Sequence, residues 1–308
     1  MKKISEVFLL NDKKDLNARY RSALESAIRA SGAVVKSKGV YESILSPFKI
    51  FFEILYSRPL VVSSNIKSNL FFLSLPWIRG LVILNGVGRY REIRVFRQLL
   101  IFLFFINARK VVAIQSYSDY RYFRRYSSSR QRLRWVPGSG GSQKEFGTRQ
   151  GVVLVQRDNK LPLVFPSVSD FLKKTHFNGA LFVVGCNNIT DLESLFDSVQ
   201  CEVVNIGFVP QDDIFHHGDA FLQPSGYGEG FPHTLADAIA SRMKIYISKL
   251  EYLRYGLREM EFQVDPVADG WLQLVPSEAA AKMVSEESVT NSYLEALDSS
   301  SGLIKGYP

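Results

Sequence analysis

Two acidic residues stand eight positions apart around a glycine-rich turn, in the stretch PSGYGEGFPHTLADAIASRMKIYIS that runs from 224 to 248. Glu229 lies in the turn, and Asp237 lies inside the helix that we expect to follow it. Pro232 suits the first position of that helix, because its missing N–H costs nothing there. The free N–H groups and the positive dipole end of a helix start favour a phosphate or a carboxylate. The turn is therefore a candidate anion site.

The two acids limit what that anion can be. Carboxylates repel a diphosphate, so if Glu229 and Asp237 contact the ligand they should accept hydrogen bonds from its hydroxyls. A ligand with phosphate in the middle and hydroxyls at both ends is a nucleotide sugar. The alternative is a glycine-rich turn in some other α/β domain, with two solvated acids.

The elements around the turn should hold it at the edge of a sheet. The apolar run 219–223 reads as a strand before the turn, and 244–248 reads as a strand after the helix. Between them Leu235, Ala238, Ile239 and Met243 recur at helical spacing, so they should bury one face of the helix. The sequence thus predicts strand, turn, helix, strand.

The order and spacing of these residues resemble a known motif. Glu229-Gly-Phe-Pro followed by Asp237 is similar to the Glu-x7-Glu motif of the retaining glycosyltransferases of family 4. Asp stands where the second Glu is usual, which shortens its reach by one methylene. The resemblance implies an α/β protein of the GT-B fold, with two Rossmann-like domains whose parallel sheets face an interdomain cleft.

The same resemblance assigns roles to residues of the second domain. It implies that Glu229 accepts from donor-sugar hydroxyls and Asp237 from the ribose, and that Arg157 and Lys160 bind the diphosphate. Arg can grip a phosphate with two hydrogen bonds, whereas Lys acts as a point charge. The catalytic set is therefore Glu229, Arg157 and Lys160, although the two bases could also be ordinary surface residues. Further donor-binding positions are Gly230, Phe231, His233, Thr234, Leu235 and Asp237 at the motif, with Gly207 and Phe208 in the loop expected beside the nucleobase.

Neither a metal nor a cofactor is expected, apart from the UDP- or GDP-sugar that serves as donor. The histidines and cysteines have no spaced partners for a metal site. His233 could donate to the ligand or merely support the turn.

The chain has two electrically different halves. Residues 1–150 carry 27 Lys and Arg against 9 Asp and Glu, whereas residues 151–308 carry 11 against 21. Val136-Pro-Gly-Ser-Gly-Gly between them resembles the hinge that ends the first domain of the family. We therefore expect a basic, acceptor-binding domain at 1–141 and a nucleotide-sugar-binding domain with terminal helices at 142–308. A basic half implies an anionic partner.

Residues 89–110 favour a membrane as that partner. Arginines at 89, 91, 94 and 97 precede the apolar run 99–106, which is far shorter than the roughly 20 residues that span a bilayer. Such a helix can lie in the membrane interface; the alternative is a buried core helix with a solvated first turn. Tyr and Arg interleave at 117–134, but no recognised nucleic-acid motif accompanies them, so we expect no nucleic-acid partner.

The function expected from the sequence is that of a retaining, metal-independent transferase of the hexosyltransferase type. It would move a sugar from a nucleotide sugar to a lipid-linked glycan acceptor in bacterial surface polysaccharide or lipopolysaccharide synthesis. The N-terminus has no persuasive signal peptide and the two cysteines form no disulfide framework, so we expect a cytoplasmic, membrane-associated protein at the inner face of the cytoplasmic membrane.

Two departures from the family leave alternatives open. The first loop reads Asn11-Asp-Lys-Lys-Asp, where a pair of glycines is usual, and the first histidine of the chain is His176. Either the lysines substitute electrostatically or this loop has left the active site. The runner-up is a degenerate, non-catalytic GT-B protein that binds a membrane or a partner. A nucleotide-binding α/β enzyme of another kind is the third reading.

Overall fold

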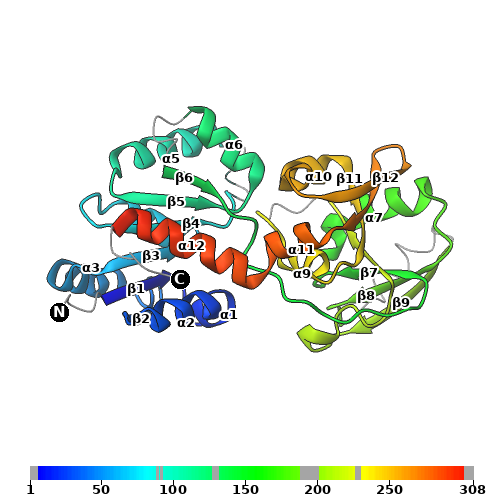
Figure 1. Cartoon of the computed structure of the whole chain (residues 1–308), viewed down its shortest axis with the longest axis horizontal. Helices are drawn as coiled ribbons and strands as arrows, with labels where there is room; N and C mark the ends of the chain where they lie inside the picture. Colours follow the sequence, from blue (N-terminus) through cyan, green and yellow to red (C-terminus); the bar gives the residue numbers. More distant parts are fainter. Residues whose placement is uncertain are drawn as a thin grey trace. The chain divides into compact units, whose positions relative to one another are not determined.

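The computed structural model describes residues 6–87, 90, 93–126, 132–187, 201–225 and 230–301. The chain divides into two compact units. The first comprises residues 1–139, 228–231 and 286–308, and the second comprises residues 140–227 and 232–285. Each unit contains its own sheet with helices packed on it (Figure 1).

The first unit is built on a parallel sheet of six strands. In spatial order these are β2 (Val34–Gly39), β1 (Glu6–Asn11), β3 (Leu60–Ser64), β4 (Gly80–Leu84), β5 (Lys110–Ile114) and β6 (Leu133–Trp135). β3, β4 and β5 are almost entirely buried, as expected for strands covered on both faces.

Helices cover both faces of that sheet. One face carries α3 (Ser46–Ser57), α4 (Ile66–Leu73), α5 (Arg94–Ile106) and α6 (Tyr117–Tyr126), whose apolar residues form one core cluster with the strands. The other face carries α2 (Ser22–Ala30), which follows the short α1 (Asp15–Tyr20), and the C-terminal α12 (Glu286–Ser301). Parallel strands joined by covering helices are the Rossmann-like arrangement.

The second unit has a mainly parallel sheet of seven strands. In spatial order these are β12 (Phe262–Ala268), β13 (Trp271–Pro276), β11 (Lys244–Ser248), β10 (Ala220–Gln223), β7 (Gly151–Val155), β8 (Ala180–Val184) and β9 (Glu202–Gly207). β13 pairs antiparallel with both β11 and β12, while the other pairs are parallel. The helices are α7 (Leu161–Lys174), α9 (His233–Ala240), α10 (Lys249–Tyr255) and α11 (Glu278–Val284), with short 3₁₀ turns at Gln211–Asp213 and Leu257–Glu259.

The strand, turn, helix, strand order around residue 230 is found as β10, α9 and β11, and the α/β class with two Rossmann-like units is confirmed. The C-terminal helix lies in the first unit. The predicted boundary grouped the terminal helices with the second domain, but the sequence left open whether the final helix returns to the first domain; α12 packs on α2, β4 and β5 of the first unit. Its apolar side chains Val289, Tyr293 and Leu297 are buried in that contact, which explains the assignment to the first unit. None of the described helices is long and apolar enough to cross a membrane.

Lys110, the first residue of β5, is a buried cation with no carboxylate partner among the described residues. It is 1% exposed, and its Nζ donates to the Leu75 carbonyl oxygen at 2.7 Å and to the Asn107 side chain. The ammonium also lies over the Phe72 ring. Burial lowers the pKa of Lys110 from 10.5 to about 7, because the charged form loses its hydration.

This burial predicts that the protein becomes more stable as the pH rises from about 7 toward 10.5. In that window the unfolded chain binds the Lys110 proton and the folded chain does not, so the free energy of unfolding should increase by at most about 1.4 kcal/mol per pH unit. Urea unfolding at pH 7, 8 and 9 measures it. Lys110→Met should remove most of this rise, and the exposed control Lys173→Met should keep it. An equal rise in Lys110→Met would contradict the prediction.

Candidate functional site

The predicted second-unit residues gather at the carboxyl edge of its sheet. Arg157 and Lys160 lie in the loop after β7, Gly207 ends β9 and Phe208 follows it, and α9 begins shortly after β10. β8, the next strand along the chain, lies on one side of β7, and β10 lies on the other. This edge therefore contains a topological switch point. Open α/β sheets bind their ligands at such points.

The two basic residues of the β7–α7 loop, Arg157 and Lys160, lie close together in the sequence. The Lys160 backbone N–H donates to the Arg157 carbonyl oxygen at 2.8 Å, and Lys160 precedes the first residue of α7. The Arg157 side chain is exposed. At the end of β9, which β8 separates from β7, Gly207 has a φ of +74°, which favours glycine, and the Phe208 ring is exposed. The edge thus presents cationic and aromatic side chains on its loops.

Asp237 is buried inside α9 and anchors the segment that enters the second unit. Its side chain is 0% exposed, and its Oδ1 accepts a hydrogen bond from the Ser142 backbone N–H at 2.8 Å. Its Oδ2 has no hydrogen-bond partner in the described part of the chain. The His233 Nε2 lies 3.9 Å from that oxygen and 3.1 Å from the Gln211 Nε2. One oxygen of Asp237 is therefore structural, and the other is buried without a hydrogen-bond partner among the described residues.

A steric constraint explains why residue 141 is glycine, although the hinge that it resembles usually has Val at this position. A Cβ at Gly141 would lie 2.3 Å from the Ala236 carbonyl oxygen, so only glycine allows this segment to lie on α9. Just before it, Gly138 and Gly140 have φ values of +78° and +97°. The boundary between the two units falls between Ser139 and Gly140, within the predicted hinge.

The other motif residues fall into three groups. Glu229 lies outside the described residues. Gly230 and Phe231 belong to the first unit, where a Cβ at Gly230 would lie 1.5 Å from the Asn85 carbonyl oxygen. Thr234 is half-buried, whereas the Leu235 side chain is wholly buried, so Leu235 could contact a ligand only through its backbone N–H.

A polar edge in the first unit was not predicted. The side-chain amides of four asparagines form a chain of hydrogen bonds in which each donates to the next: Asn85 to Asn65, Asn65 to Asn11, and Asn11 to Asn17. Asn17 ends the chain by donating to the Leu9 carbonyl oxygen and the Ser37 hydroxyl. The available signal was that the strand runs ending at 11, 64 and 84 are each completed or followed by asparagine.

The buried guanidinium of Arg21 begins this chain. It donates to the Asn85 Oδ1 at 2.8 Å, to the Ser64 hydroxyl at 3.0 Å and to the Ser139 hydroxyl at 3.1 Å. Because burial removes its hydration, the pKa of Arg21 is lowered, while the neighbouring Tyr293 opposes that change. Arginine only donates, so the amide of Asn85 must turn its oxygen toward it.

A cavity of about 540 Å³ opens on this edge, lined by Asp12, Asn65, Ile66, Asn85, Gly86, Val87 and Tyr90. Asp12 uses one carboxylate oxygen to accept from the backbone and the hydroxyl of Ser68, at the start of α4. Asn65 has φ 69° and ψ 157°, a backbone region that is essentially reserved for glycine. Amides, a carboxylate and an aromatic ring are groups that can bind the hydroxyls and the apolar face of a sugar.

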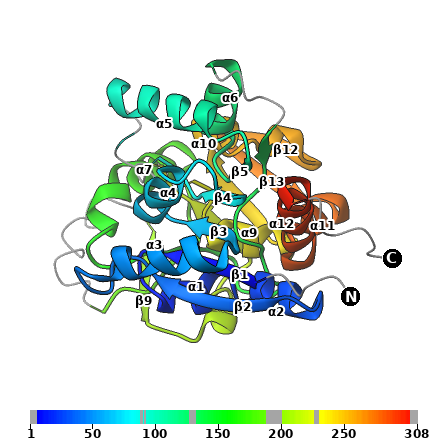
Figure 2. The same ribbon diagram turned by 90° about the vertical axis from the view of Figure 1, so that its left-hand side faces the viewer.

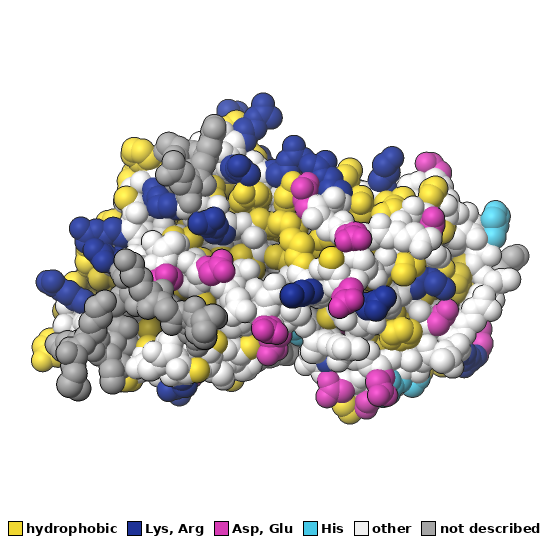
Figure 3. All heavy atoms as spheres, in the orientation of Figure 1, with side chains coloured by type: hydrophobic (Ala, Val, Ile, Leu, Met, Phe, Trp, Pro, Cys, Tyr) yellow, Lys and Arg dark blue, Asp and Glu magenta, His cyan; other side chains and the backbone are white. Residues whose placement is uncertain are grey.

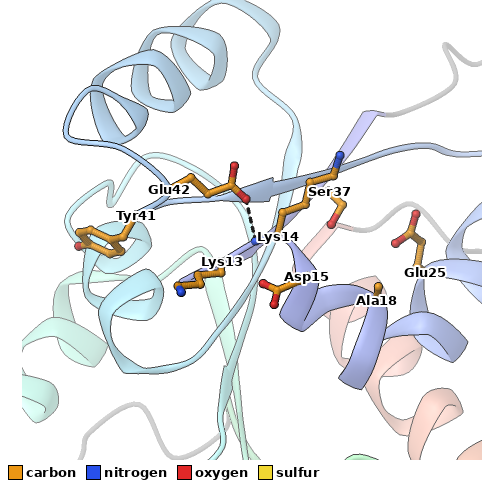
Figure 4. Close-up of a pocket in the computed structure, with 8 residues that line it drawn as sticks. All are labelled: Lys13, Lys14, Asp15, Ala18, Glu25, Ser37, Tyr41 and Glu42. Carbon is orange, nitrogen blue, oxygen red and sulfur yellow. Dashed lines mark hydrogen bonds between the residues drawn. The ribbon is translucent and has the colours of Figure 1, made fainter.

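The two lysines of the first loop line a separate cavity of about 730 Å³ (Figure 4). Lys13 and Lys14 share it with the carboxylates of Asp15, Glu25 and Glu42. The Lys14 backbone N–H donates to the Glu42 Oε1 at 2.9 Å. With three acids beside two lysines, this cavity does not favour a phosphate.

No group of three or more His, Cys, Asp or Glu side chains in the described part of the chain could hold a metal ion.

Comparison with solved structures identifies the fold. The Anabaena protein Alr3699/HepE in complex with UDP-glucose matches over 96% of this chain and 99% of its own, with a TM-score of 0.62 and 10% identity. The S. aureus MnaA–UDP structure matches over 99% of both chains, with a TM-score of 0.52 and 9% identity. A putative UDP-N-acetylglucosamine 2-epimerase from Listeria monocytogenes gives a TM-score of 0.51 at 9% identity, over 96% of this chain and 88% of that one.

The fold is GT-B. No family model matches the sequence, and no curated protein matches it significantly.

The strain at Asn65 predicts an unusual order of stability. Asn65→Gly and Asn65→Ala both lose the amide hydrogen bonds, but glycine relieves a backbone strain of about 1–3 kcal/mol. Asn65→Gly should therefore unfold at higher urea concentration than Asn65→Ala. At the exposed Asn178, whose φ is not positive, glycine should be the less stable replacement by about 0.4–1 kcal/mol. If the glycine variant were less stable than the alanine variant at both sites, Asn65 would be shown to be unstrained.

Proposed function

We propose that this protein is a glycosyltransferase that takes a sugar from a UDP-sugar and passes it to a hydroxyl of a glycan acceptor. The observation that carries the proposal is the carboxyl edge of the second sheet, where Arg157, Lys160 and the start of α9 flank the switch point. The fold supports it, since solved proteins of this fold include one bound to UDP-glucose and one bound to UDP. These complexes favour uridine over the guanosine donor that the sequence left open.

The proposed mechanism assigns the leaving group to the second unit. As the bond between the sugar and the diphosphate breaks, negative charge develops on the departing UDP. Arg157, Lys160 and the free N–H groups of residues 233–235 would stabilise that charge. Because these groups are already fixed on short loops and a helix start, no metal ion is required.

The acids of the motif would hold the hydroxyls of the donor. Glu229 would accept from the sugar, whose ring carries positive charge in the transition state. The Oδ2 of Asp237, which lacks a hydrogen-bond partner among the described residues, would accept from the ribose. We propose that transfer retains the configuration of the sugar, as the resemblance of the motif implies.

The first unit would receive the acceptor. Its cavity of about 540 Å³ combines side-chain amides, the Asp12 carboxylate and the Tyr90 ring, which suit a glycan. We propose that the acceptor is a lipid-linked glycan of cell-surface polysaccharide or lipopolysaccharide synthesis, reached at the inner face of the cytoplasmic membrane.

Donor binding can be tested by thermal shift. UDP at about 100 times its Kd should add roughly 2.7 kcal/mol of stability, whereas GDP and ADP at the same concentration should add less. Arg157→Met should weaken the UDP shift because it removes a phosphate contact, and Arg149→Met, an exposed arginine outside the site, should not. Asp237→Asn keeps an acceptor for Ser142 and should also bind UDP more weakly. A wild type that no nucleotide stabilises would favour the non-catalytic alternative.

Catalysis can be tested at Glu229. Glu229→Gln should lower the rate of sugar transfer by about a hundredfold or more, because a neutral amide supports the positive sugar ring less well. The unfolding temperature should stay close to that of the wild type. Glu259→Gln, at an exposed position, is the matched control. Product analysis separates transfer from epimerisation or hydrolysis of the UDP-sugar, and full transfer activity in Glu229→Gln would overturn the assignment.

A further inference from the structure

The helix layer on one face of the first unit leaves large apolar side chains uncovered. Along α3 and the residue run before it, Ile44, Phe48, Phe52 and Tyr56 stand four positions apart and are between 63% and 95% exposed. Residues four apart share one side of a helix. The buried side of α3 is formed by Ile50 and Ile54, two positions away and thus on the opposite side. α3 is therefore apolar on both its core face and its solvent face.

α5 repeats the arrangement. Leu100 and Phe104 are its buried residues, whereas Val95, Leu99, Phe102 and Phe105 are between 43% and 78% exposed. The core-helix alternative considered for this segment therefore accounts for only one of its faces. Figure 2 shows α4 between α3 and α5, and the buried residues of all three helices form one core cluster with the sheet. The two outward stripes belong to one helix layer.

Three exposed arginines border this layer. Arg79 and Arg109 stand directly before β4 and β5, and Arg58 stands two residues before β3; the three strands are neighbours in the sheet. Parallel strands begin at the same edge and lie about 4.8 Å apart, so the three arginines form a row. The Arg109 guanidinium donates to the Trp77 carbonyl oxygen, and the Trp77 ring is itself about half exposed. The row therefore lies beside aromatic side chains.

Acidic groups do not neutralise this surface. Residues 40–126 contain thirteen Lys and Arg against four Asp and Glu. Of the described acids in this range, Glu42 accepts from the Lys14 backbone N–H, Glu53 is paired with Lys38, and Asp119 is buried. In Figure 3, Lys and Arg spheres lie among hydrophobic ones at the left-hand end, where Figure 1 labels α3 and α5.

We propose that this face docks on an anionic lipid bilayer, with Phe48, Phe52 and Tyr56 of α3 and the outer stripe of α5 entering the interface. Apolar side chains bordered by arginines match a layer of anionic headgroups over hydrocarbon. Trp and Tyr are the side chains that settle at the headgroup level. The arginine row lies at the edge of the sheet opposite the asparagine chain, so lipid attachment leaves the polar edge open. This docking stands apart from sugar transfer and does not rest on it.

The test is co-sedimentation of the full chain with vesicles of phosphatidylcholine alone and with vesicles of equal parts phosphatidylcholine and phosphatidylglycerol. The wild type should sediment with the anionic vesicles at low salt, and binding should fall in high salt and without phosphatidylglycerol. Phe48→Ser with Phe52→Ser should lower the partition coefficient by about tenfold or more, because two aromatic rings no longer leave water. Arg79→Gln with Arg109→Gln should lower it by about tenfold as well.

Matched controls make the result specific to this face. Leu163→Ser with Leu250→Ser removes two exposed apolar residues of the second unit, and Lys173→Gln with Arg149→Gln removes two exposed cations there. Both controls should bind vesicles like the wild type. All four variants should keep the thermal shift with UDP, so loss of lipid binding is distinguishable from loss of donor binding.

Three outcomes would overturn the docking proposal. The first is a wild type that ignores anionic vesicles at low salt, and the second is an equal loss in the control variants. The third is a wild type that dimerises without lipid in sedimentation velocity while Phe48→Ser with Phe52→Ser stays monomeric. That third result would show that a second copy of the chain, through its acidic half, covers the face.

Discussion

The buried guanidinium of Arg21 determines the carboxyl edge of the first sheet. An amide side chain can point either its oxygen or its nitrogen at a neighbour, but a guanidinium accepts no hydrogen bond. Asn85 must therefore turn its amide oxygen toward Arg21, so its amide nitrogen donates to the Asn65 oxygen. The Asn65 nitrogen in turn donates to the Asn11 oxygen. The amides that line the cavity at this edge are thus held in one orientation before any ligand arrives.

The C-terminal helix completes this edge. The Tyr293 ring of α12 lies 5.5 Å from the Arg21 guanidinium, and its hydroxyl donates to the Gly138 carbonyl oxygen at 2.7 Å. Gln115 donates to both the Tyr293 hydroxyl and the Gly138 carbonyl oxygen. Burial raises the pKa of Tyr293, so the hydroxyl keeps its proton for this bond. The last helix of the chain thereby fixes the segment that precedes the glycines at 138 and 140.

The sequence predicted what depends on local periodicity. The buried strands and the helix after Pro232 were readable because their apolar residues recur at strand or helix spacing. The destination of α12 was not, because its contacts with α2, β4 and β5 lie almost 200 residues or more away along the chain. The asparagine chain was missed for the same reason, since Asn11, Asn65 and Asn85 meet only after three strands align.

Periodicity does not show how much of α3 is covered, and it leaves one part of the site untested. A helix that is apolar nearly all round is usually a core helix, but the sheet covers only one side of α3 and leaves Phe48 and Phe52 in solvent. The reason for glycine at 141 became clear only from its approach to Ala236. Glu229, the first acid of the motif, lies outside the described residues, so its role still rests on the sequence.

The positions of the charged residues separate two proposed roles of the cations, phosphate binding and lipid docking. At the carboxyl edge of the first sheet, asparagines and one buried arginine line one cavity, and Lys13 and Lys14 lie beside three acids in another. Exposed arginines with no such acids around them in the described residues lie at the opposite edge, at Arg58, Arg79 and Arg109. A donor diphosphate would instead meet a few cations, Arg157 and Lys160, in a half that carries 21 acids against 11 bases. In the proposed function, the local position of a few cations would bind the phosphate, whereas the net charge of the first half would attract the large, flat surface of a bilayer.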